Sequence, residues 1–260
     1  MSPADYHASL AIGSTAVKDW LDAEAAGDWT TWSARYAAGP MLDHWRRDGL
    51  EVPPDYRATA LLVDAARFKS TRATQRGSLV EALLWSPEDP EELKWAGIDR
   101  ASVKELASAR EVVELIKMKC PRVRDVLAAG AVVDRQVSEH ATVRGVPCKM
   151  RVDLAWTTPA GRLHLDFKLW TQWSQDPLHL VERWGALTQA AHYQIVSKVT
   201  RPDVAHFSDL LVVHPGGPGV LPKEFYIEFQ PQEMERATAR VESVLDGMAK
   251  FFAVQEENAA

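Results

Sequence analysis

The chain has 260 residues, of which 46% are hydrophobic and 25% are charged, and its formal net charge at pH 7 is -6. This length suits one large α/β domain, and the negative charge is not typical of a protein that coats nucleic acid, although it leaves room for a local basic channel. The two cysteines, Cys120 and Cys148, are too few for a disulfide framework, a structural zinc site or an iron–sulfur cluster. Without a membrane-length apolar run or a leader pattern, the sequence predicts a cytoplasmic protein.

The first part of the chain, residues 1–70, is expected to form a helical extension packed on the core. Ser14 can cap a first helix, and residues 56–68 favour another. A basic polar segment that contains Arg72 and Arg76 then precedes an apolar helix.

This apolar helix, Gly77–Trp85, contains a single acid, Glu81. A carboxylate is costly to bury unless it is paired or coordinated. Glu81 is therefore either a ligand or a member of the exposed stripe of an amphipathic helix, and the helix alone slightly favours the exposed stripe.

Two more helices and a strand are expected before residue 145. Ser86–Asp89 supplies a cap and a proline at the first helical position. Asp99 or Ser102 opens a further helix, which Pro121 ends. Residues 131–143 then favour a strand.

The most informative stretch is Gly145–Lys168, which predicts two strands joined by a short polar turn. In both strands apolar residues alternate with charged ones, a period that is typical of half-buried strands. The turn favours the antiparallel register that closes Trp156 against Leu163. In that register Asp153 lies directly opposite Asp166.

The facing carboxylates define a candidate metal site, because like charges destabilise a sheet unless positive charge lies between them. Oxygen ligands of this kind favour Mg²⁺ or Mn²⁺, and Lys168 could orient or deprotonate a water on the metal. The alternative is a solvent-exposed face on which Arg151, opposite Lys168, helps to neutralise the two aspartates. The hairpin alone leaves the two interpretations even.

The next helix is expected to start at Asp176–Pro177 and to run to about Lys198. Gln189 and Tyr193 are four residues apart and share one face of it. They form either part of a site or an ordinary pair of a surface amide and a half-buried tyrosine.

The remaining segments complete an α/β pattern. Trp170 and Trp173, in a loop before this helix, look exposed and could stack on bases or ribose, although packing is the commoner use of tryptophan. Residues 207–214 and 224–229 favour strands, and a last helix is expected over residues 231–252.

The segments, in this order, resemble the PD-(D/E)xK nuclease superfamily, and within it the RecE-type, lambda-exonuclease-like enzymes of phages and prophages. The resemblance covers most of the chain and rests on RGSLVEALL, RGVPCKMRVD, LDFK and QAAHY, which are similar to the GT-x-hydrophobic-HALL helix, the R-P-D strand, the D-x-K strand and the Q-x-x-x-Y motif. It implies a restriction-endonuclease-like core, a central mixed β-sheet flanked by helices, as a single domain over residues 1–260.

The resemblance also implies residue roles in metal-dependent phosphodiester hydrolysis. The implied ligands of Mg²⁺, for which Mn²⁺ can substitute, are Asp153, Asp166, Glu81 and the main-chain carbonyl of Phe167. Lys168 would position or activate the attacking water, and Gln189 and Tyr193 would orient the water or the phosphate. Candidate contacts to the DNA backbone are Arg72, Arg76, Lys149 and Arg151.

The implied activity is 5′→3′ digestion of double-stranded DNA from an end, which leaves a single-stranded tail for an annealing protein in recombination. Relatives form closed rings, so a homo-oligomer that threads DNA, in a bacterial or phage-infected cell, is implied. Two alternatives stay open: a structure- or site-specific endonuclease of the same fold, and a catalytically silent scaffold that binds DNA or a recombinase.

Overall fold

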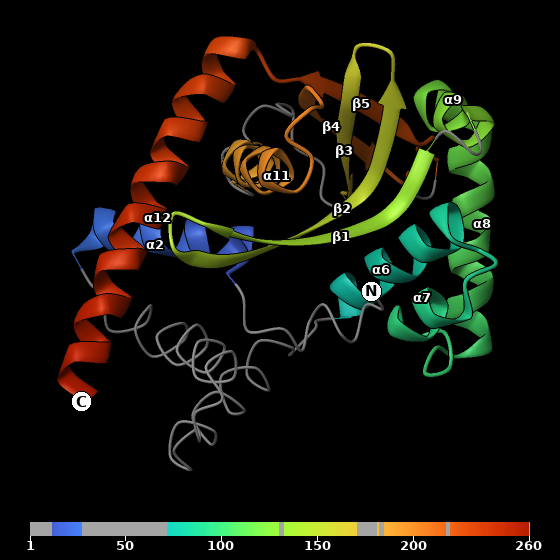
Figure 1. Ribbon diagram of the computed structural model, residues 1–260. Coiled ribbons are helices and arrows are strands. Elements are labelled where there is room, and N and C mark those ends of the chain that lie inside the picture. The colour runs from blue at the N-terminus through green and yellow to red at the C-terminus, as the bar shows by residue number, and fades with distance from the viewer. Residues whose placement is uncertain are drawn as a thin grey trace.

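The computed structural model describes residues 12–27, 72–129, 133–170, 181, 185–216 and 219–259. They form a five-stranded sheet with helices on both faces (Figure 1). The strands, in spatial order, are β1 (Val133–Val143), β2 (Val146–Thr158), β3 (Gly161–Leu169), β4 (His206–His214) and β5 (Lys223–Glu228). β3 and β4 run parallel and the other neighbours are antiparallel. The predicted fold class, α/β with a mixed sheet flanked by helices, is confirmed.

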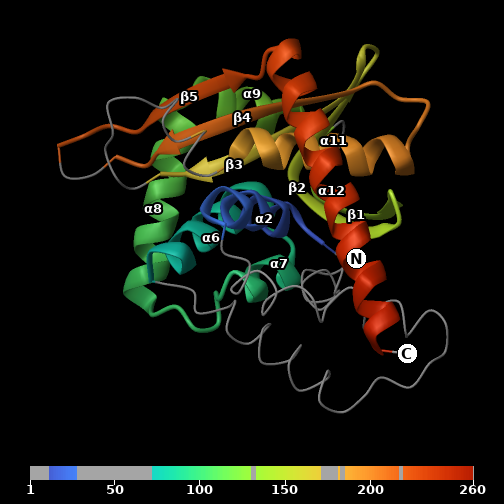
Figure 2. The same cartoon turned by 90° about the vertical axis from the view of Figure 1, so that its left-hand side faces the viewer.

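Two groups of helices cover the sheet (Figures 1 and 2). One group consists of α6 (Arg72–Trp85), α7 (Pro90–Trp95), α8 (Val103–Lys119) and α9 (Pro121–Ala129). The other consists of α2 (Ser14–Ala26), α11 (Ala186–Thr200) and α12 (Pro231–Ala259). The first core packs α2, α11 and α12 against β1 and the first half of β2, and the second packs α6, α8 and α9 against β3, β4 and the rest of β2.

Side-chain caps mark the starts of two helices, and one of these helices also begins with a proline. α7 begins at Pro90, because the backbone N–H groups of Glu91 and Glu92 donate to Asp89 Oδ1 at 2.9 and 3.1 Å; the start expected within Ser86–Asp89 was therefore placed too early. Ser102 opens α8 with a capping box, as expected.

Pro121 both follows α8 and begins a helix, α9, that the sequence did not predict. The first turn of α9 is capped from a distance, because Glu224 on β5 accepts the backbone N–H of Arg122 at 2.9 Å. α6 also begins earlier than expected, at Arg72, and α12 extends to Ala259.

The start of α11 differs from the expectation, because the helix begins at Ala186. Gly185 precedes it with φ +63°, a left-handed conformation that suits glycine and interrupts a continuous helix. A Cβ at this position would also lie 2.9 Å from the side chain of Lys18, so α2 and α11 approach closely here. The predicted start at Asp176–Pro177 lies outside the described residues.

The described part of the N-terminal extension is α2 and the residues beside it. Ile12 forms a parallel bridge to Cys148 of β2, and Trp20 packs so closely on α12 that a Cβ on Gly247 would lie 2.9 Å from its ring. The helix expected at residues 56–68 lies outside the described residues. Cys120 and Cys148 are buried, which raises the pKa of each thiol to about 12.

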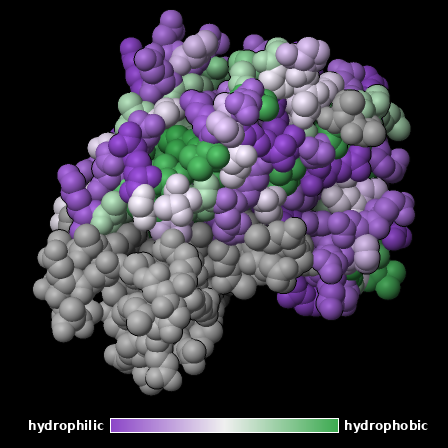
Figure 3. Space-filling model, viewed as in Figure 1, coloured by the Kyte–Doolittle hydropathy of each residue, from purple (hydrophilic) through white to green (hydrophobic). Residues whose placement is uncertain are grey.

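The coloured surface seen in Figure 3 is mainly hydrophilic, with hydrophobic areas between hydrophilic residues. Among the helices that the structure describes, none has the length and apolar character needed to cross a bilayer.

Candidate active site

The strands β2 and β3 diverge where the two aspartates lie. They pair in the predicted register, with Trp156 opposite Leu163, but this pairing ends one residue before Asp153 and Asp166. Beyond that point β2 stays paired with β1, and β3 stays paired with β4. The sheet therefore divides into a fork, and the aspartates are the first residues inside it.

The packing of β2 shows how abrupt this change is. Val152 belongs to the first core and Leu154 to the second. Residues two apart on a regular strand share a face, so β2 turns its faces over at Asp153. This places the Asp153 carboxylate between the two halves of the sheet.

Asp153 also bridges the fork. Its Oδ2 accepts the backbone N–H of Phe167 at 2.7 Å, which provides a partner for a main-chain donor of β3. The Phe167 side chain is buried and meets Trp85 of α6 edge to face, with ring centroids 5.3 Å apart. The use of the Phe167 carbonyl as a metal ligand stays a prediction.

α6 turns Glu81 toward these aspartates, which corrects the expectation of an exposed stripe. Glu81 is only partly accessible, and its carboxyl group hydrogen-bonds with that of Asp153. A hydrogen bond between two carboxyl groups requires a proton on one of them. The pair therefore keeps a proton at pH values at which isolated, exposed carboxyl groups would be ionised.

The pKa values follow from this crowding. Burial raises the pKa of Asp153 to about 7, and the neighbouring charge of Glu81 contributes in the same direction. Burial also raises the pKa of Asp166 to about 7, against the opposing effect of Lys168. The pKa of Glu81 is raised as well, again chiefly by burial.

Lys168 is the counter-charge of the cluster. Its Nζ lies 2.5 Å from Asp166 Oδ2. Burial alone would lower the pKa of Lys168, but the charges of Asp166 and Asp153 outweigh it and hold this pKa above its ordinary value. The ammonium group is therefore protonated at neutral pH, and of the two roles expected for Lys168, orienting a water fits this state better than deprotonating it.

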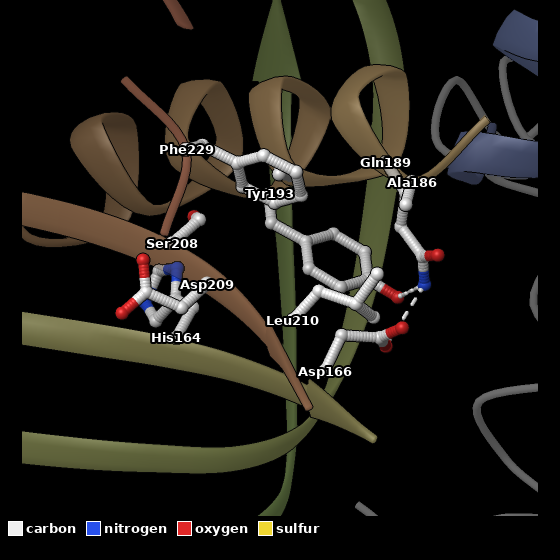
Figure 4. Close-up of a pocket in the computed structure, with 10 residues that line it drawn as sticks. His164, Asp166, Ala186, Gln189, Tyr193, Ser208, Asp209, Leu210 and Phe229 are labelled. Carbon is white, nitrogen blue, oxygen red and sulfur yellow. Dashed lines mark hydrogen bonds between the residues drawn. The ribbon is translucent and has the colours of Figure 1, made fainter. Parts of the chain in front are cut away.

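α11 brings Gln189 to Asp166 and places Tyr193 on the same helix face, which is the shared face that their spacing predicted (Figure 4). Gln189 Nε2 lies 3.2 Å from Asp166 Oδ1 and 2.6 Å from the Tyr193 hydroxyl oxygen. Despite its contact with Lys168, the buried Asp166 Oδ2 accepts no hydrogen bond of good geometry from the residues that the structure describes. Asp166 Oδ2 is thus held chiefly by its ion pair with Lys168.

A small pocket adjoins this side of the site, with space for about one water molecule. Its polar lining residues are His164, Asp166, Gln189, Tyr193, Ser208 and Asp209 (Figure 4). Asp166, Gln189 and Tyr193 thus share the lining of this pocket.

The candidate DNA contacts do not gather at the carboxylates. Arg76 is exposed on α6 and donates to Ser108 at 3.3 Å. Lys149 is 6% exposed, and the Arg151 side chain is 10% exposed and ion-paired with Glu92. The structure therefore does not support Lys149 and Arg151 as backbone contacts. Nothing is described of the Arg72 side chain.

Two further expectations concern neighbouring residues. Arg151 does not face Lys168, because its partner in the ladder is Ser138 of β1. Trp170 is buried and lies edge-on to His214, with ring centroids 6.1 Å apart, so it is a packing residue and not an exposed stacking platform. Trp173 lies outside the described residues.

One polar residue of the site was missed by sequence reasoning. Gln136 on β1 donates from Nε2 to Glu81 Oε1 at 3.0 Å and accepts at Oε1 from Arg151 Nε at 2.9 Å. Its φ is +51°, in the left-handed region that residues other than glycine rarely adopt. The sequence offers no signal for this conformation.

The carboxyl groups of the site are possible ligands of a divalent cation. Within the described segments, no three His, Cys, Asp or Glu side chains form a ready-made cage for a metal. Mg²⁺ does not require one, because it is usually held by one or two carboxylates, with waters and substrate phosphates completing its shell. Asp153 and Asp166 fit that requirement, since they supply two neighbouring carboxyl groups, and a bound cation would offset the burial and mutual repulsion that raise their pKa values.

Comparisons with known proteins add little. No protein-family model and no curated protein matches the sequence. A solved structure from Eubacterium rectale, described provisionally as an exonuclease, aligns with a TM-score of 0.49 and 16% identity over 71% of this chain and 70% of that chain. A second, the protein SSO0001, aligns with a TM-score of 0.31 and 13% identity over 71% of this chain and 81% of that chain. Similarities of this size do not assign a role to this chain.

Proposed function

We propose that this chain is a metal-dependent deoxyribonuclease that hydrolyses phosphodiester bonds. One observation carries the proposal: carboxyl groups from α6, β2 and β3 meet Lys168 inside the fork of the sheet. Carboxylate oxygens lie beside the Lys168 ammonium group and a pocket with space for about one water molecule. These groups match the requirements of phosphodiester hydrolysis, in which the negative charge on the phosphate must be neutralised.

The proposed cofactor is Mg²⁺, with Mn²⁺ able to replace it. Asp153 and Asp166 would hold it, with Glu81 and the Phe167 carbonyl as further ligands. When bound, the cation supplies Lewis-acid polarisation of the scissile phosphate and stabilises the leaving oxygen.

The other side chains of the site orient and donate. The Lys168 ammonium group has three N–H donors and faces Asp166 on one side. Its other donors can therefore hold a water or a phosphate oxygen next to the carboxylates. The Gln189 amide fixes the Tyr193 hydroxyl at 2.6 Å, which presents a preset polar edge along α11. Positioning of this kind lowers the entropy cost of bringing the reactants into their reactive geometry.

The proposed substrate is the end of double-stranded DNA, digested 5′→3′ to leave a single-stranded tail for an annealing protein. This part of the proposal is supported by the resemblance of RGSLVEALL, RGVPCKMRVD, LDFK and QAAHY to the RecE-type segments. A ring-shaped homo-oligomer is proposed on the same basis. Arg76, which is exposed on the helix that carries Glu81, is the remaining described candidate for a phosphate contact.

The test is digestion of end-labelled linear duplex in Mg²⁺, with covalently closed circles of the same sequence as the control. Release of the 5′ label as mononucleotide before the 3′ label, with intact circles, is the expected result. Cleavage of the circles would instead identify the endonuclease of the same fold. Intact linear DNA, with no binding of Mn²⁺ in calorimetry, would identify the silent scaffold.

The raised pKa values of Asp153 and Asp166 predict how pH and metal affect stability. Because each pKa is higher in the folded state than its ordinary value near 3.8, the contribution of these two aspartates to the stability of the metal-free protein is fully present at low pH and is lost as pH rises through about 7. A cation requires the ionised form, so Mg²⁺ at about 100 times its dissociation constant should add roughly 2.7 kcal/mol at pH 8 and much less at pH 5. Thermal unfolding at both pH values measures the difference.

The Asp166→Asn variant is the control for this prediction, since it keeps the shape of the side chain and removes its charge. It should lose most of the pH-dependent effect of Mg²⁺. An equal effect of Mg²⁺ at pH 5 and pH 8 in the native protein would contradict the assignment of the aspartates as ligands.

A further inference from the structure

A neutral donor, the side-chain amide of Gln136, holds the carboxyl group of Glu81. Gln136 Nε2 donates to Glu81 Oε1 at 3.0 Å, from a strand on which Gln136 lies level with Asp153. The ladder between β1 and β2 pairs the residues on either side, Arg135 with Leu154 and Val137 with Val152, and leaves out Gln136 and Asp153. The irregularity of β1 thus coincides with the place where β2 turns over.

The direction of the Gln136 amide is fixed by its second partner. Arg151 Nε donates to Gln136 Oε1 at 2.9 Å, and a guanidinium can only donate. The oxygen of the amide must therefore face Arg151, which leaves the NH₂ group for Glu81. An amide flipped by 180° would place two donors together at Arg151 and two acceptors together at Glu81.

Arg151 is itself firmly held. Its Nη1 donates to Ser138 Oγ at 3.0 Å, and its Nη2 is ion-paired with Glu92 of α7. The side chains of Arg151 and Glu92 are 10% and 12% exposed. The position of the guanidinium is thus set by two strands and a helix, and Gln136 transmits that position to α6.

The identity of the transmitting residue matters electrostatically. A guanidinium in direct contact with Glu81 would neutralise the carboxylate and compete with a divalent cation. A neutral amide supplies a hydrogen bond without a formal charge, and the charge of Arg151 is met by Glu92. Glu81 is then oriented and still attractive to a cation.

We propose that Gln136 is a positioning residue that aims Glu81 at the metal, with Arg151 as its anchor. This inference rests on the proposed function, because it concerns a ligand of the proposed cation. Partners that orient metal ligands typically contribute about tenfold to a hundredfold to metal affinity. Gln136 therefore acts on metal affinity more than on the chemical step.

The Gln136→Met variant tests this role, because methionine has a similar length and no hydrogen-bonding amide. Titration calorimetry with Mn²⁺ on DNA-free protein should show affinity reduced about tenfold. The Mn²⁺ concentration that gives half-maximal DNA hydrolysis should rise by the same factor, while kcat at saturating Mn²⁺ stays within about twofold. Should Gln136→Met fold poorly in a thermal unfolding assay, Gln136→Leu is expected to give the same result.

Gln232→Met is the matched control, because it makes the same substitution at an exposed glutamine of α12. Its Mn²⁺ affinity should stay close to that of the native protein. Native affinity in Gln136→Met, or an equal loss in Gln232→Met, would overturn the positioning role alone. A native protein that binds no Mn²⁺ would overturn the proposed function, and the positioning role with it.

Discussion

Replacing Lys168 by alanine should reduce digestion of linear duplex by about 10² to 10³-fold, the range typical for the loss of one preorganised hydrogen-bond donor in an active site. The ammonium lies 2.5 Å from Asp166, so its loss removes both a donor to the reacting groups and the charge that opposes protonation of the aspartates. The initial rate of release of an end label in Mg²⁺ measures the effect.

Lys198→Ala provides the control for this variant, because Lys198 is exposed near the end of α11. It should digest DNA within about twofold of the native rate, as expected of most surface substitutions. If Lys168→Ala were folded and as active as Lys198→Ala, the assignment of the fork as the active site would be wrong.

The second large effect is expected at Trp85, which fixes the helix of Glu81 against the strand of Asp166. Trp85 is fully buried and its ring meets that of Phe167, the residue between Asp166 and Lys168. Trp85→Ala should lower the free energy of unfolding by about 3–5 kcal/mol, because it leaves a large cavity in the second core. Urea unfolding should show a lower midpoint with an unchanged slope.

Trp85→Phe separates packing from the polar part of the indole. The indole N–H finds no acceptor among the residues that the structure describes, so its removal offsets part of the lost volume. The cost should then be about 1 kcal/mol. A cost equal to that of Trp85→Ala would show that a phenyl ring recovers none of the packing that the indole provides at this position.

The sequence was informative where structure is determined locally. The alternation of charged and apolar residues, together with the short turn, was sufficient to place Trp156 opposite Leu163 and so to bring Asp153 and Asp166 together. The four-residue spacing of Gln189 and Tyr193 likewise predicted that they share a face, because helix geometry alone decides it.

Features that depend on distant partners could not be predicted. Glu81 was slightly favoured as exposed because its helix gives no sign of the fork that α6 meets. Arg151 was taken for a DNA contact because its partner, Glu92, is far away in the sequence. Trp170 was expected to be exposed, since its burial depends on contacts with β4, such as that with His214.

The fork also sets an order for the folding of the chain. β2 and β3 join through a short turn, so their hairpin can form within microseconds, whereas the parallel strand β4 needs a long crossover that includes α11, a non-local closure that is intrinsically slower. Until that closure, Gln189 and Tyr193 are absent from Asp166, and the aspartates remain hydrated and ionise as ordinary carboxylates. A chain still emerging from the ribosome is thus expected to contain Asp153 and Asp166 in a hairpin before Gln189 reaches them.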